Sequence, residues 1–339
     1  MGVTIKDIAK RTGLSITTIS LVLNKKENRI PEKTRQIIES AAQELNYSPN
    51  QVAVSLSTKK SNLIGLVIPR GTSYYFANLV SSIERACRNA GYSLGISLPE
   101  SDGDSCLEAI QEMLHRGVDG VIFDPSNLGE DFYRAYIDMV FESDTPISSL
   151  AGAGAHLLSN SVIPDYKRGG FLAASHLLEL GHRRIGFIAG SRENYAVSDL
   201  LLGVEEALEE KGMGGEALPV LFGANTAAFG REGLDSLLEA GGPTGVIAAS
   251  DSIAAGILRR AFEMGIHVPR QLSVLGYGNS SAGAEYQVSL TTVSIHYDRI
   301  ARKAVNLIKK LTQNGSARTP ELIAPSLIVR ESTAAPGTA

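Results

Sequence analysis

The sequence has no tryptophan, only two cysteines and no long apolar run, and these absences exclude several classes of protein. Cys87 and Cys106 have no partner in a CxxC pair, so we expect two buried or half-buried thiols rather than a zinc site or a disulfide framework. No stretch approaches the ~20 apolar residues of a membrane helix. The N-terminal residues lack the apolar core of a secretory signal, so a cytoplasmic protein without a membrane partner is expected.

Motifs of the common enzyme classes are also missing. The sequence contains no GxxxxGK[ST], HExxH or GxSxG. The segment GAGAH at residues 152–156 lacks the third glycine of a dinucleotide-binding loop, and we interpret it as an ordinary loop. The six histidines are scattered, with His182 in a helix-to-strand turn where a structural role is expected. The sequence therefore predicts neither an enzyme nor a cofactor.

Charge is distributed unevenly along the chain. The net charge is -4, yet residues 1–60 carry ten Lys/Arg against five Asp/Glu, so this segment is +5 and the remainder is -9. A basic head on an acidic body indicates that the head binds a polyanion and the body does not.

The basic head has the pattern of three short helices. Thr4 with Asp7 forms a variant of the capping box, and a first helix should end near Gly13, where a positive φ is allowed. Ser15 can cap a second helix that extends to Asn24. A third helix fits residues 31–45, with proline in its first turn. Two short helices around a tight glycine turn indicate a helix-turn-helix, although three-helix bundles also have other uses.

The exact residues of this N-terminal segment are more informative than their helical pattern. TIKDIAKRTGLSITTISLVLN, TRQIIESAAQELNYSPN and VAVSL resemble the headpiece of the lactose-repressor (LacI/GalR) family without a gap over residues 3–58. The resemblance implies that the second helix enters the major groove of double-stranded operator DNA and reads bases with Ile16, Thr17 and Thr18. The residues that it implies for phosphate contacts are Thr4, Ser15, Ser20, Asn24, Tyr47 and Asn50.

Two positions of this head depart from the family or allow a second interpretation. The family usually has Arg or His where this chain has Leu21, and leucine cannot make the bidentate contact of arginine with guanine. Ile16 could belong to the core, but Ile19, Val22 and Leu23 already supply a core face. Exposure of Ile16 to DNA is therefore the favoured interpretation.

A hinge helix is implied for residues 51–58, within a hinge and linker segment of residues 51–61. In the family this segment folds in the minor groove, where a leucine from each subunit kinks the DNA. Leu56 occupies that position, and Ala53 is small enough for two hinge helices to approach. Val54 stands where arginine is common. Paired hinge helices imply a homodimer and a roughly palindromic operator.

The body alternates apolar runs with helical stretches, which predicts an α/β fold with parallel sheets covered by helices. The expected strands, too many for one sheet, are residues 63–69, 93–98, 120–123, 147–149, 161–163, 185–189, 246–249 and 273–277. The segments IGLVIP, RGVDGVIF, GHRRIGFIAG, ASDSIAAGIL, GIHVPRQLSVLGYGN and LTTVSI again resemble the LacI/GalR family.

This resemblance implies a periplasmic-binding-protein-like body of two doubly wound subdomains behind the all-α headpiece of residues 1–50. The expected division is an N-subdomain at about 62–162 and 292–322, a C-subdomain at about 163–291 and 323–330, and a disordered tail at 331–339. Parallel sheets bind ligands beyond the carboxyl ends of their strands, here between the subdomains.

Aromatic and polar side chains follow several of these strands. Stacking by an aromatic ring and hydrogen bonds from Asp or Asn suit a small-molecule effector such as a sugar or nucleoside. Each Asp or Asn could equally be a capping or turn residue, and each aromatic a core residue. The candidate effector-binding residues are Tyr74, Tyr75, Phe76, Asp124, Arg192, Asn194, Asn225, Asp251 and Asn279.

Four polar positions of the family's effector site are altered in this chain. Leu200, Gly278 and Ile295 stand where Arg, Asp and Gln are common, and Pro164–Asp165 interrupts a VDN pattern. Loss of hydrogen-bonding partners costs much affinity in a buried site. Either the chain is a regulator of sugar type, or its effector site is degenerate or takes a non-sugar ligand through residues such as Arg70, Arg192, Tyr195 and His296.

The leading hypothesis is a homodimeric transcription regulator, usually a repressor, controlled by a small-molecule effector. A solute-binding protein without DNA function is the main alternative from another class. A doubly wound enzyme is the third hypothesis, and it lacks a catalytic set.

Overall fold

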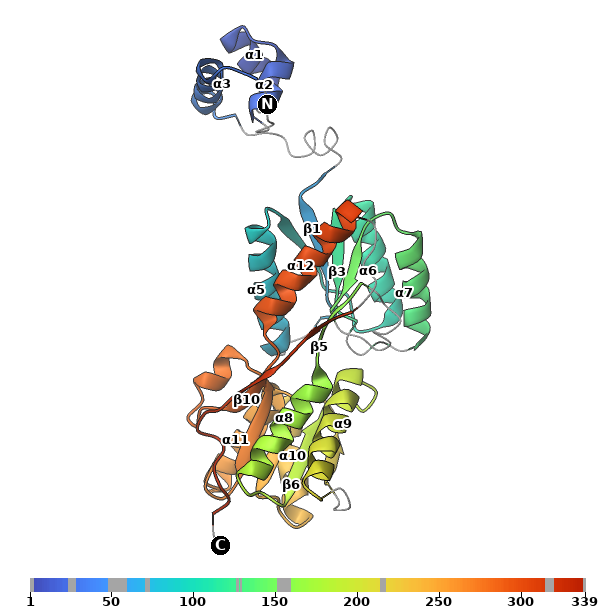
Figure 1. Cartoon of the computed structure of the whole chain (residues 1–339), viewed down its shortest axis with the longest axis vertical. Coiled ribbons are helices and arrows are strands. Elements are labelled where there is room, and N and C mark those ends of the chain that lie inside the picture. The colour runs from blue at the N-terminus through green and yellow to red at the C-terminus, as the bar shows by residue number, and fades with distance from the viewer. Residues whose placement is uncertain are drawn as a thin grey trace. The chain divides into compact units, whose positions relative to one another are not determined.

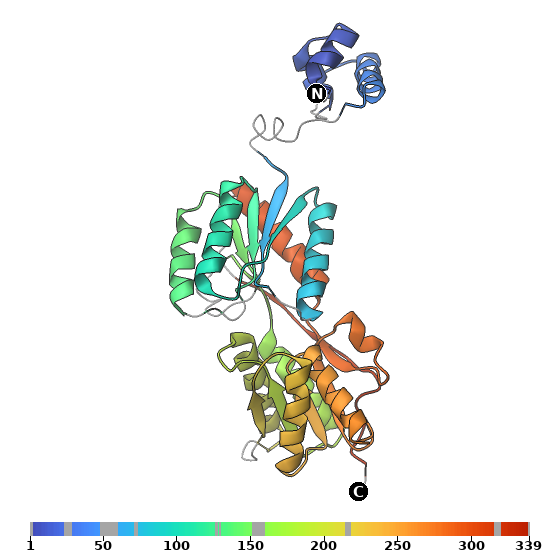
Figure 2. The same cartoon turned by 180° about the vertical axis from the view of Figure 1, so that it is seen from behind.

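The structure, a computed structural model, describes residues 3–23, 29–47, 60–70, 74–125, 128, 130–150, 160–213, 218–314 and 320–337. The chain forms two compact units, a headpiece of residues 1–62 and a body of residues 63–339. Figures 1 and 2 show the helices and strands of each unit from opposite sides.

The headpiece contains the three expected helices, α1 (Ile5–Thr12), α2 (Ile16–Leu23) and α3 (Glu32–Glu44). The backbone N–H and the hydroxyl of Thr4 both donate to Asp7 Oδ2, at 2.8 and 2.7 Å. This capping box fixes the start of α1, and Gly13 ends it with a φ of 72°. The helix ends predicted from capping residues are therefore confirmed.

A small apolar cluster holds the three helices together. Its buried members come from all three helices and are Ile8, Ile19, Val22, Ile38, Ala41 and Ala42. Each helix contributes one fully buried isoleucine, Ile8, Ile19 or Ile38, so the apolar faces of the three helices share one core.

The N-subdomain of the body has a parallel sheet in the order β2-β1-β3-β4. Alternate residues of its strands point to opposite faces, so Leu66 and Ile122 pack in one core cluster while Val67 and Phe123 pack in another. Helices cover both faces of this sheet (Figure 2). Its elements are β1 (Leu63–Val67), α5 (Tyr74–Asn89), β2 (Ser93–Ser97), α6 (Gly103–His115), β3 (Gly120–Phe123), α7 (Glu130–Glu142), β4 (Ile147–Ser149) and α12 (Tyr297–Asn314).

The C-subdomain has a larger sheet in the order β12-β10-β9-β8-β6-β7, with only β12 antiparallel to its neighbour. A separate pair, β5 (Val162–Pro164) and β11 (Glu321–Ile323), is parallel. The remaining elements are α8 (Tyr166–Glu179), β6 (Ile185–Ala189), α9 (Tyr195–Glu210), β7 (Val220–Phe222), α10 (Ala227–Glu239), β8 (Gly245–Ala248), α11 (Asp251–Glu263), β9 (Ser273–Gly278), η1 (Ser281–Ala284), β10 (Thr291–Ser294) and β12 (Ser326–Ile328).

Two helix pairs of the C-subdomain pack closely through glycines. A Cβ on Gly170 would lie 1.9 Å from the carbonyl oxygen of Leu200, and one on Gly203 would lie 1.8 Å from that of Lys167. Gly230 and Gly256 make the same kind of approach between α10 and α11. The absence of a side chain at these positions sets the distance between the helices.

The division of the body needs one correction. The expected N-subdomain began its second segment at residue 292, but β10 pairs with β9 in the C-subdomain sheet. Only the following helix, α12, packs against α5 and β3 of the N-subdomain. The chain therefore crosses between subdomains after Ser294.

Strands β7, β10, β11 and β12 are short and were not among the expected strands.

The expectation of a disordered tail from residue 331 is wrong for the described part of that tail. Ser332 is fully buried, and its hydroxyl donates to the carbonyl of Val274 at 2.6 Å. The carbonyl of Ala334 accepts hydrogen bonds at 2.9 Å from His182 Nε2 and at 3.0 Å from the hydroxyl of Ser273. Small residues allow this segment to lie along the sheet, and backbone hydrogen bonds hold it there.

His182 anchors this tail. Its ring is fully buried, and Nδ1 lies 2.9 Å from the Thr244 hydroxyl. The structural role expected for His182 is therefore confirmed, as is the burial of Cys87 and Cys106.

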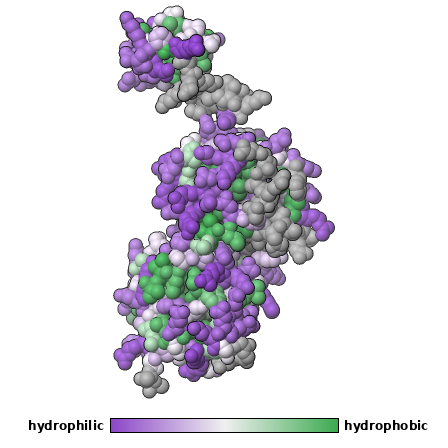
Figure 3. All heavy atoms as spheres, viewed as in Figure 1, coloured by the Kyte–Doolittle hydropathy of each residue, from purple (hydrophilic) through white to green (hydrophobic). Residues whose placement is uncertain are grey.

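In the face of the body shown in Figure 3, hydrophilic residues dominate, and hydrophobic residues gather on the C-subdomain near its junction with the N-subdomain.

Candidate functional site

Two groups of residues are candidates for function: the start of α2 in the headpiece, and a cavity in the body. At the start of α2, Ile16 is 45% exposed and Thr17 is also exposed. Ile19 and Val22 are buried, so the core face of α2 is the one expected and Ile16 is outside it. This arrangement leaves an apolar side chain and a hydroxyl on the surface, where base edges could be read.

The hydroxyl groups near α2 already have local partners. Ser15 Oγ accepts the Thr18 N–H at 3.0 Å and lies 2.8 Å from the Thr18 hydroxyl. The Thr4 hydroxyl donates to Asp7, and this bond is the main cause that lowers the pKa of the Asp7 carboxyl. Thr4 could therefore contact a phosphate through its hydroxyl only if this bond were broken. Among the described residues, the Thr17 hydroxyl makes no hydrogen bond that would have to be broken.

The other candidates for DNA contact are less exposed or undescribed. Ser20 and Leu21 are half-buried on α2, and the half-buried Tyr47 packs against the headpiece core. The remaining candidates, Asn24, Asn50, Ala53 and Leu56, and with them the expected hinge helix, lie outside the described residues.

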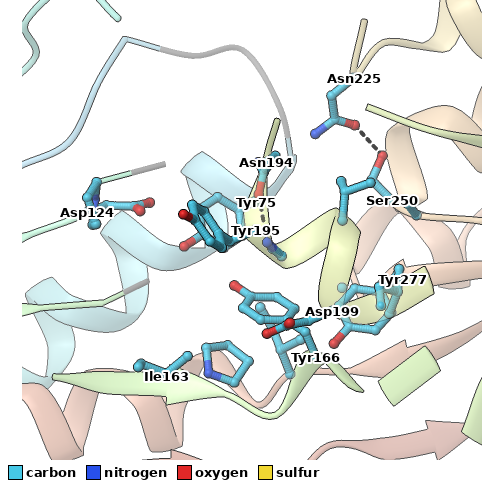
Figure 4. Close-up of a pocket in the computed structure, with 18 of the residues that line it drawn as sticks. Tyr75, Asp124, Ile163, Tyr166, Asn194, Tyr195, Asp199, Asn225, Ser250 and Tyr277 are labelled. Carbon is cyan, nitrogen blue, oxygen red and sulfur yellow. Dashed lines mark hydrogen bonds between the residues drawn. The ribbon is translucent and has the colours of Figure 1, made fainter. Parts of the chain in front are cut away.

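In the body, a cavity of about 640 Å³ opens between the two subdomains. Its walls come from loops after β1, β3, β5, β6, β8 and β9, and from the starts of α5, α8, α9 and α11. This is the position beyond the carboxyl ends of parallel strands where a ligand is expected. Figure 4 shows side chains from both subdomains facing this space.

The structure brings most of the candidate effector residues to this cavity. The candidates that line it are Tyr74, Tyr75, Phe76, Asp124, Asn194, Asn225 and Asp251. Two candidates, Arg192 and Asn279, are not part of the described lining. The guanidinium of Arg192 lies 5.7 Å from the centre of the Phe222 ring, and Asn279 Oδ1 accepts a hydrogen bond from Arg330 at 2.8 Å.

Several polar candidates in the cavity also stabilise the fold. Asn194 Oδ1 caps α9 through the Ala196 N–H at 2.9 Å, and Asn225 Oδ1 accepts from the Ser250 hydroxyl. Asp251 is 2% exposed and accepts from the Thr292 hydroxyl at 2.6 Å and from the Ser280 N–H. Burial raises the pKa of Asp251 against the effect of these hydrogen bonds. Asp251 therefore joins α11 to β10, and only its remaining acceptor capacity is available to a ligand.

Tyrosine is the residue type that sequence reasoning underestimated. Seven of the eleven tyrosines line the cavity: Tyr74, Tyr75, Tyr133, Tyr166, Tyr195, Tyr277 and Tyr297. The rings of Tyr75 and Tyr297 lie 5.8 Å apart, and those of Tyr166 and Tyr277 are stacked at 6.2 Å. The sequence signal was present for Tyr166, which lies two residues after a strand, but Tyr277 lies inside a strand and could not be distinguished from core.

Carboxylates surround these rings. Burial is the main cause that raises the pKa of Tyr166, followed by the charges of Asp124 and Asp199. Asp124 comes from the N-subdomain and Asp199 from α9 of the C-subdomain, so acidic groups from both sides act on one phenol. Asp199 was not among the candidates, because it lies within a helix and follows no strand.

The altered family positions give the cavity apolar walls. Leu200 and Ile295 are each 2% exposed and line the cavity, as does Gly278. Asp165 also lines it but caps α8 through the Arg168 N–H at 2.9 Å. The described lining thus replaces polar groups by aliphatic surface at the positions where the sequence departs from the family.

Metal-binding and membrane-spanning features are absent from the described part of the chain. No cluster of three His, Cys, Asp or Glu side chains is placed to hold a metal ion there. None of the described helices combines the length and apolar character needed to cross a membrane.

Comparisons with known proteins agree with a chain made of a headpiece and a body. Residues 4–50 match the model of bacterial regulatory proteins of the lacI family, and residues 174–333 match a periplasmic binding protein-like domain. The HTH-type transcriptional repressor PurR of Haemophilus influenzae is 32% identical over 335 residues, which cover 97% of this chain and 98% of the relative. PurR of Pasteurella multocida is 29% identical over 332 residues, covering 97% of this chain and 98% of the relative.

Solved structures give the same result. A Lac repressor dimer bound to operator and the anti-inducer ONPF matches with a TM-score of 0.88 and 28% identity, over 99% of this chain and 100% of that one. The transcriptional regulator CelR in complex with cellobiose matches with a TM-score of 0.71 and 25% identity, over 97% and 99%. The helix-turn-helix headpiece and the periplasmic-binding-protein-like body define a DNA-binding transcriptional repressor. The chain belongs to the lacI family of bacterial regulatory proteins.

Proposed function

We propose that the chain is a homodimeric repressor that binds a roughly palindromic operator and is controlled by a small molecule in the inter-subdomain cavity. The proposed site of action is the cytoplasm, because the curated relatives are repressors that act on DNA. The observation that carries the DNA-binding half is the exposed start of α2 on a basic headpiece, with Ile16 outside the core.

The α2 helix would act as the recognition helix in the major groove. Ile16 can contact a thymine methyl group, and the hydroxyls of Thr17 and Thr18 can bond to base edges. Contacts to phosphate from Ser15, Ser20 and Tyr47 would position the helix without reading sequence. Leu21 offers no bidentate contact, so its base pair should be read by shape or by an apolar contact.

The hinge is proposed to add affinity and to enforce the dimer. Leu56 would enter a central base step of the minor groove, and Ala53 would allow two hinge helices to pack. One protomer on each half-site gives the operator its two-fold symmetry.

The cavity is proposed to be the effector site. A space of about 640 Å³ accommodates a sugar or a related metabolite, and its tyrosines can stack on a ring. A ligand that contacts both subdomains stabilises the closed arrangement of the body. If the hinge helices pair differently in the open and closed arrangements, effector binding changes the affinity for DNA.

A non-sugar or degenerate effector site is a second candidate, favoured by the apolar lining from Leu200 and Ile295. The solute-binding alternative without DNA function loses its support, because the headpiece matches a family of regulators and the curated relatives are repressors.

Selection of bound duplexes from a random pool at moderate salt tests this function. We expect the purified full-length protein to enrich one palindromic motif, with an affinity that falls steeply as salt rises. Leu56→Ala should weaken operator binding strongly. Enrichment of no motif would contradict the proposal.

A further inference from the structure

The charge of the effector can be inferred from the cavity. Five acidic residues line the described part of it, Asp124, Asp165, Glu193, Asp199 and Asp251, against two basic residues, Arg70 and Lys167. A phosphate or carboxylate ligand placed here would meet an excess of like charge, which disfavours its binding.

The two basic residues also have acidic partners outside the cavity lining. Arg70 Nε lies 3.6 Å from a carboxylate oxygen of Glu100, and Lys167 Nζ lies 3.3 Å from one of Glu206. Both side chains are more than half exposed. Of the five acidic residues, Glu193 and Asp199 are exposed as well, whereas Asp124 and Asp251 are only 1% and 2% exposed, so the buried charged groups of the described lining are acidic.

Aromatic rings from both subdomains also line the cavity. Tyr75 and Tyr297 form one ring pair, and Tyr166 and Tyr277 form the other. The Tyr277 side chain is 7% exposed, and its buried hydroxyl has no hydrogen-bond partner among the described residues. The faces of tyrosine rings attract cations, and several rings with carboxylates nearby form the environment in which organic ammonium groups bind.

Asp124 and Asp199 approach this aromatic group from different subdomains. Both charges act on the phenol of Tyr166, and Figure 4 shows Asp199 beside Tyr166 and Tyr277, with Asp124 on the other side of Tyr75. Two like charges on opposite walls repel each other, and a cation between them converts this repulsion into attraction.

We propose that the effector carries a protonated amine or a quaternary ammonium group, which lies against the tyrosines and between Asp124 and Asp199. This inference rests on the proposed function of the cavity as effector site. Its consequence is that the positive charge itself favours closure of the body, because it links an acidic group of each subdomain.

Thermal unfolding of the full-length protein with matched pairs of small molecules tests this proposal. The pairs are choline with its neutral isostere 3,3-dimethylbutan-1-ol, and glucosamine with glucose, at slightly acidic pH where the amine is protonated; glucose 6-phosphate supplies an anion. We expect the cationic member of each pair to raise the Tm at about tenfold lower concentration than its neutral partner, and the phosphate ester to give no shift. Equal or larger shifts from the neutral or anionic compounds, or no shift from either cation, would overturn the proposal.

A charge-removing variant provides the second readout. Asp199→Asn keeps the shape of the side chain and should weaken binding of the cationic compounds by several-fold to about tenfold, with little change for neutral compounds. Glu209→Gln, an exposed change on the same helix, is the control and should alter neither. Equal loss for charged and neutral compounds in Asp199→Asn would show a structural role only. The DNA selection is performed without ligand, so failure of this proposal leaves that result unaffected.

Discussion

The headpiece and the body of this chain use their residues in opposite ways. In the headpiece six buried side chains make the core, and the residues proposed to read bases, Ile16, Thr17 and Thr18, follow one another on a single helix. In the body the proposed ligand-contacting residues come from segments more than two hundred positions apart, such as Tyr75 and Tyr297. Recognition of DNA therefore depends on local sequence, and recognition of the effector depends on tertiary structure.

The largest loss of stability is expected from a cavity in the small core of the headpiece. Ile38 is fully buried, and Ile38→Ala should cost about 3–4 kcal/mol. A domain of this size has little stability to lose, so operator binding should be abolished. Calorimetry should show the loss of the headpiece transition alone. If the body transition disappears as well, the two units are not independent in stability.

A slightly smaller effect is expected from overpacking in the body. Gly170→Ala would place a Cβ 1.9 Å from the Leu200 carbonyl oxygen and should destabilise the body by about 2–3 kcal/mol. Denaturant unfolding followed by tyrosine fluorescence measures this change. Gly95→Ala is the matched control, because its Cβ would meet ordinary contacts at 3.6 Å. Equal stability of the two variants would contradict the account of the α8–α9 contact.

The smallest change in stability is expected from protonation of His182, which binds the C-terminal tail. Burial lowers the pKa of His182 below its ordinary value of 6.5, with a smaller opposing effect from the Ala334 hydrogen bond. The unfolded state then binds the proton more readily, so the stabilisation is complete above pH 6.5 and decreases as the pH falls through that value. Tm measured against pH should show a decrease on the acidic side, and His182→Gln should reduce its slope. An unchanged slope in the variant would exclude His182 as the cause.

The same comparison explains what the sequence could predict. Capping residues such as Thr4 and Asp7 act within one helix, so the helix ends of the headpiece followed from local rules. Short strands such as β7 and β12 depend on neighbours in the sheet and left no periodic signal of their own. The tail was expected to be disordered from its composition, but its hydrogen bonds with Ser273 and His182 are set by tertiary contacts.

The sequence predicted some residues of the cavity correctly and placed others there wrongly. Residues directly after strands, such as Asp124, reach the cavity because parallel strands end at one edge. Arg192 and Asn279 also follow strands but turn to Phe222 and Arg330 instead. Loop position alone does not determine the direction of a side chain, and Asp199 shows that a helix can contribute as well.

The central claim is that the start of α2 reads bases while other headpiece residues only position it. Motif selection from random duplexes with two variants, Thr17→Ala and Tyr47→Phe, tests this claim most directly. The account predicts that Thr17→Ala changes the preferred base at one position of each half-site, and that Tyr47→Phe weakens binding of all sequences but keeps the motif. An unchanged motif with Thr17→Ala, or a changed one with Tyr47→Phe, would contradict it.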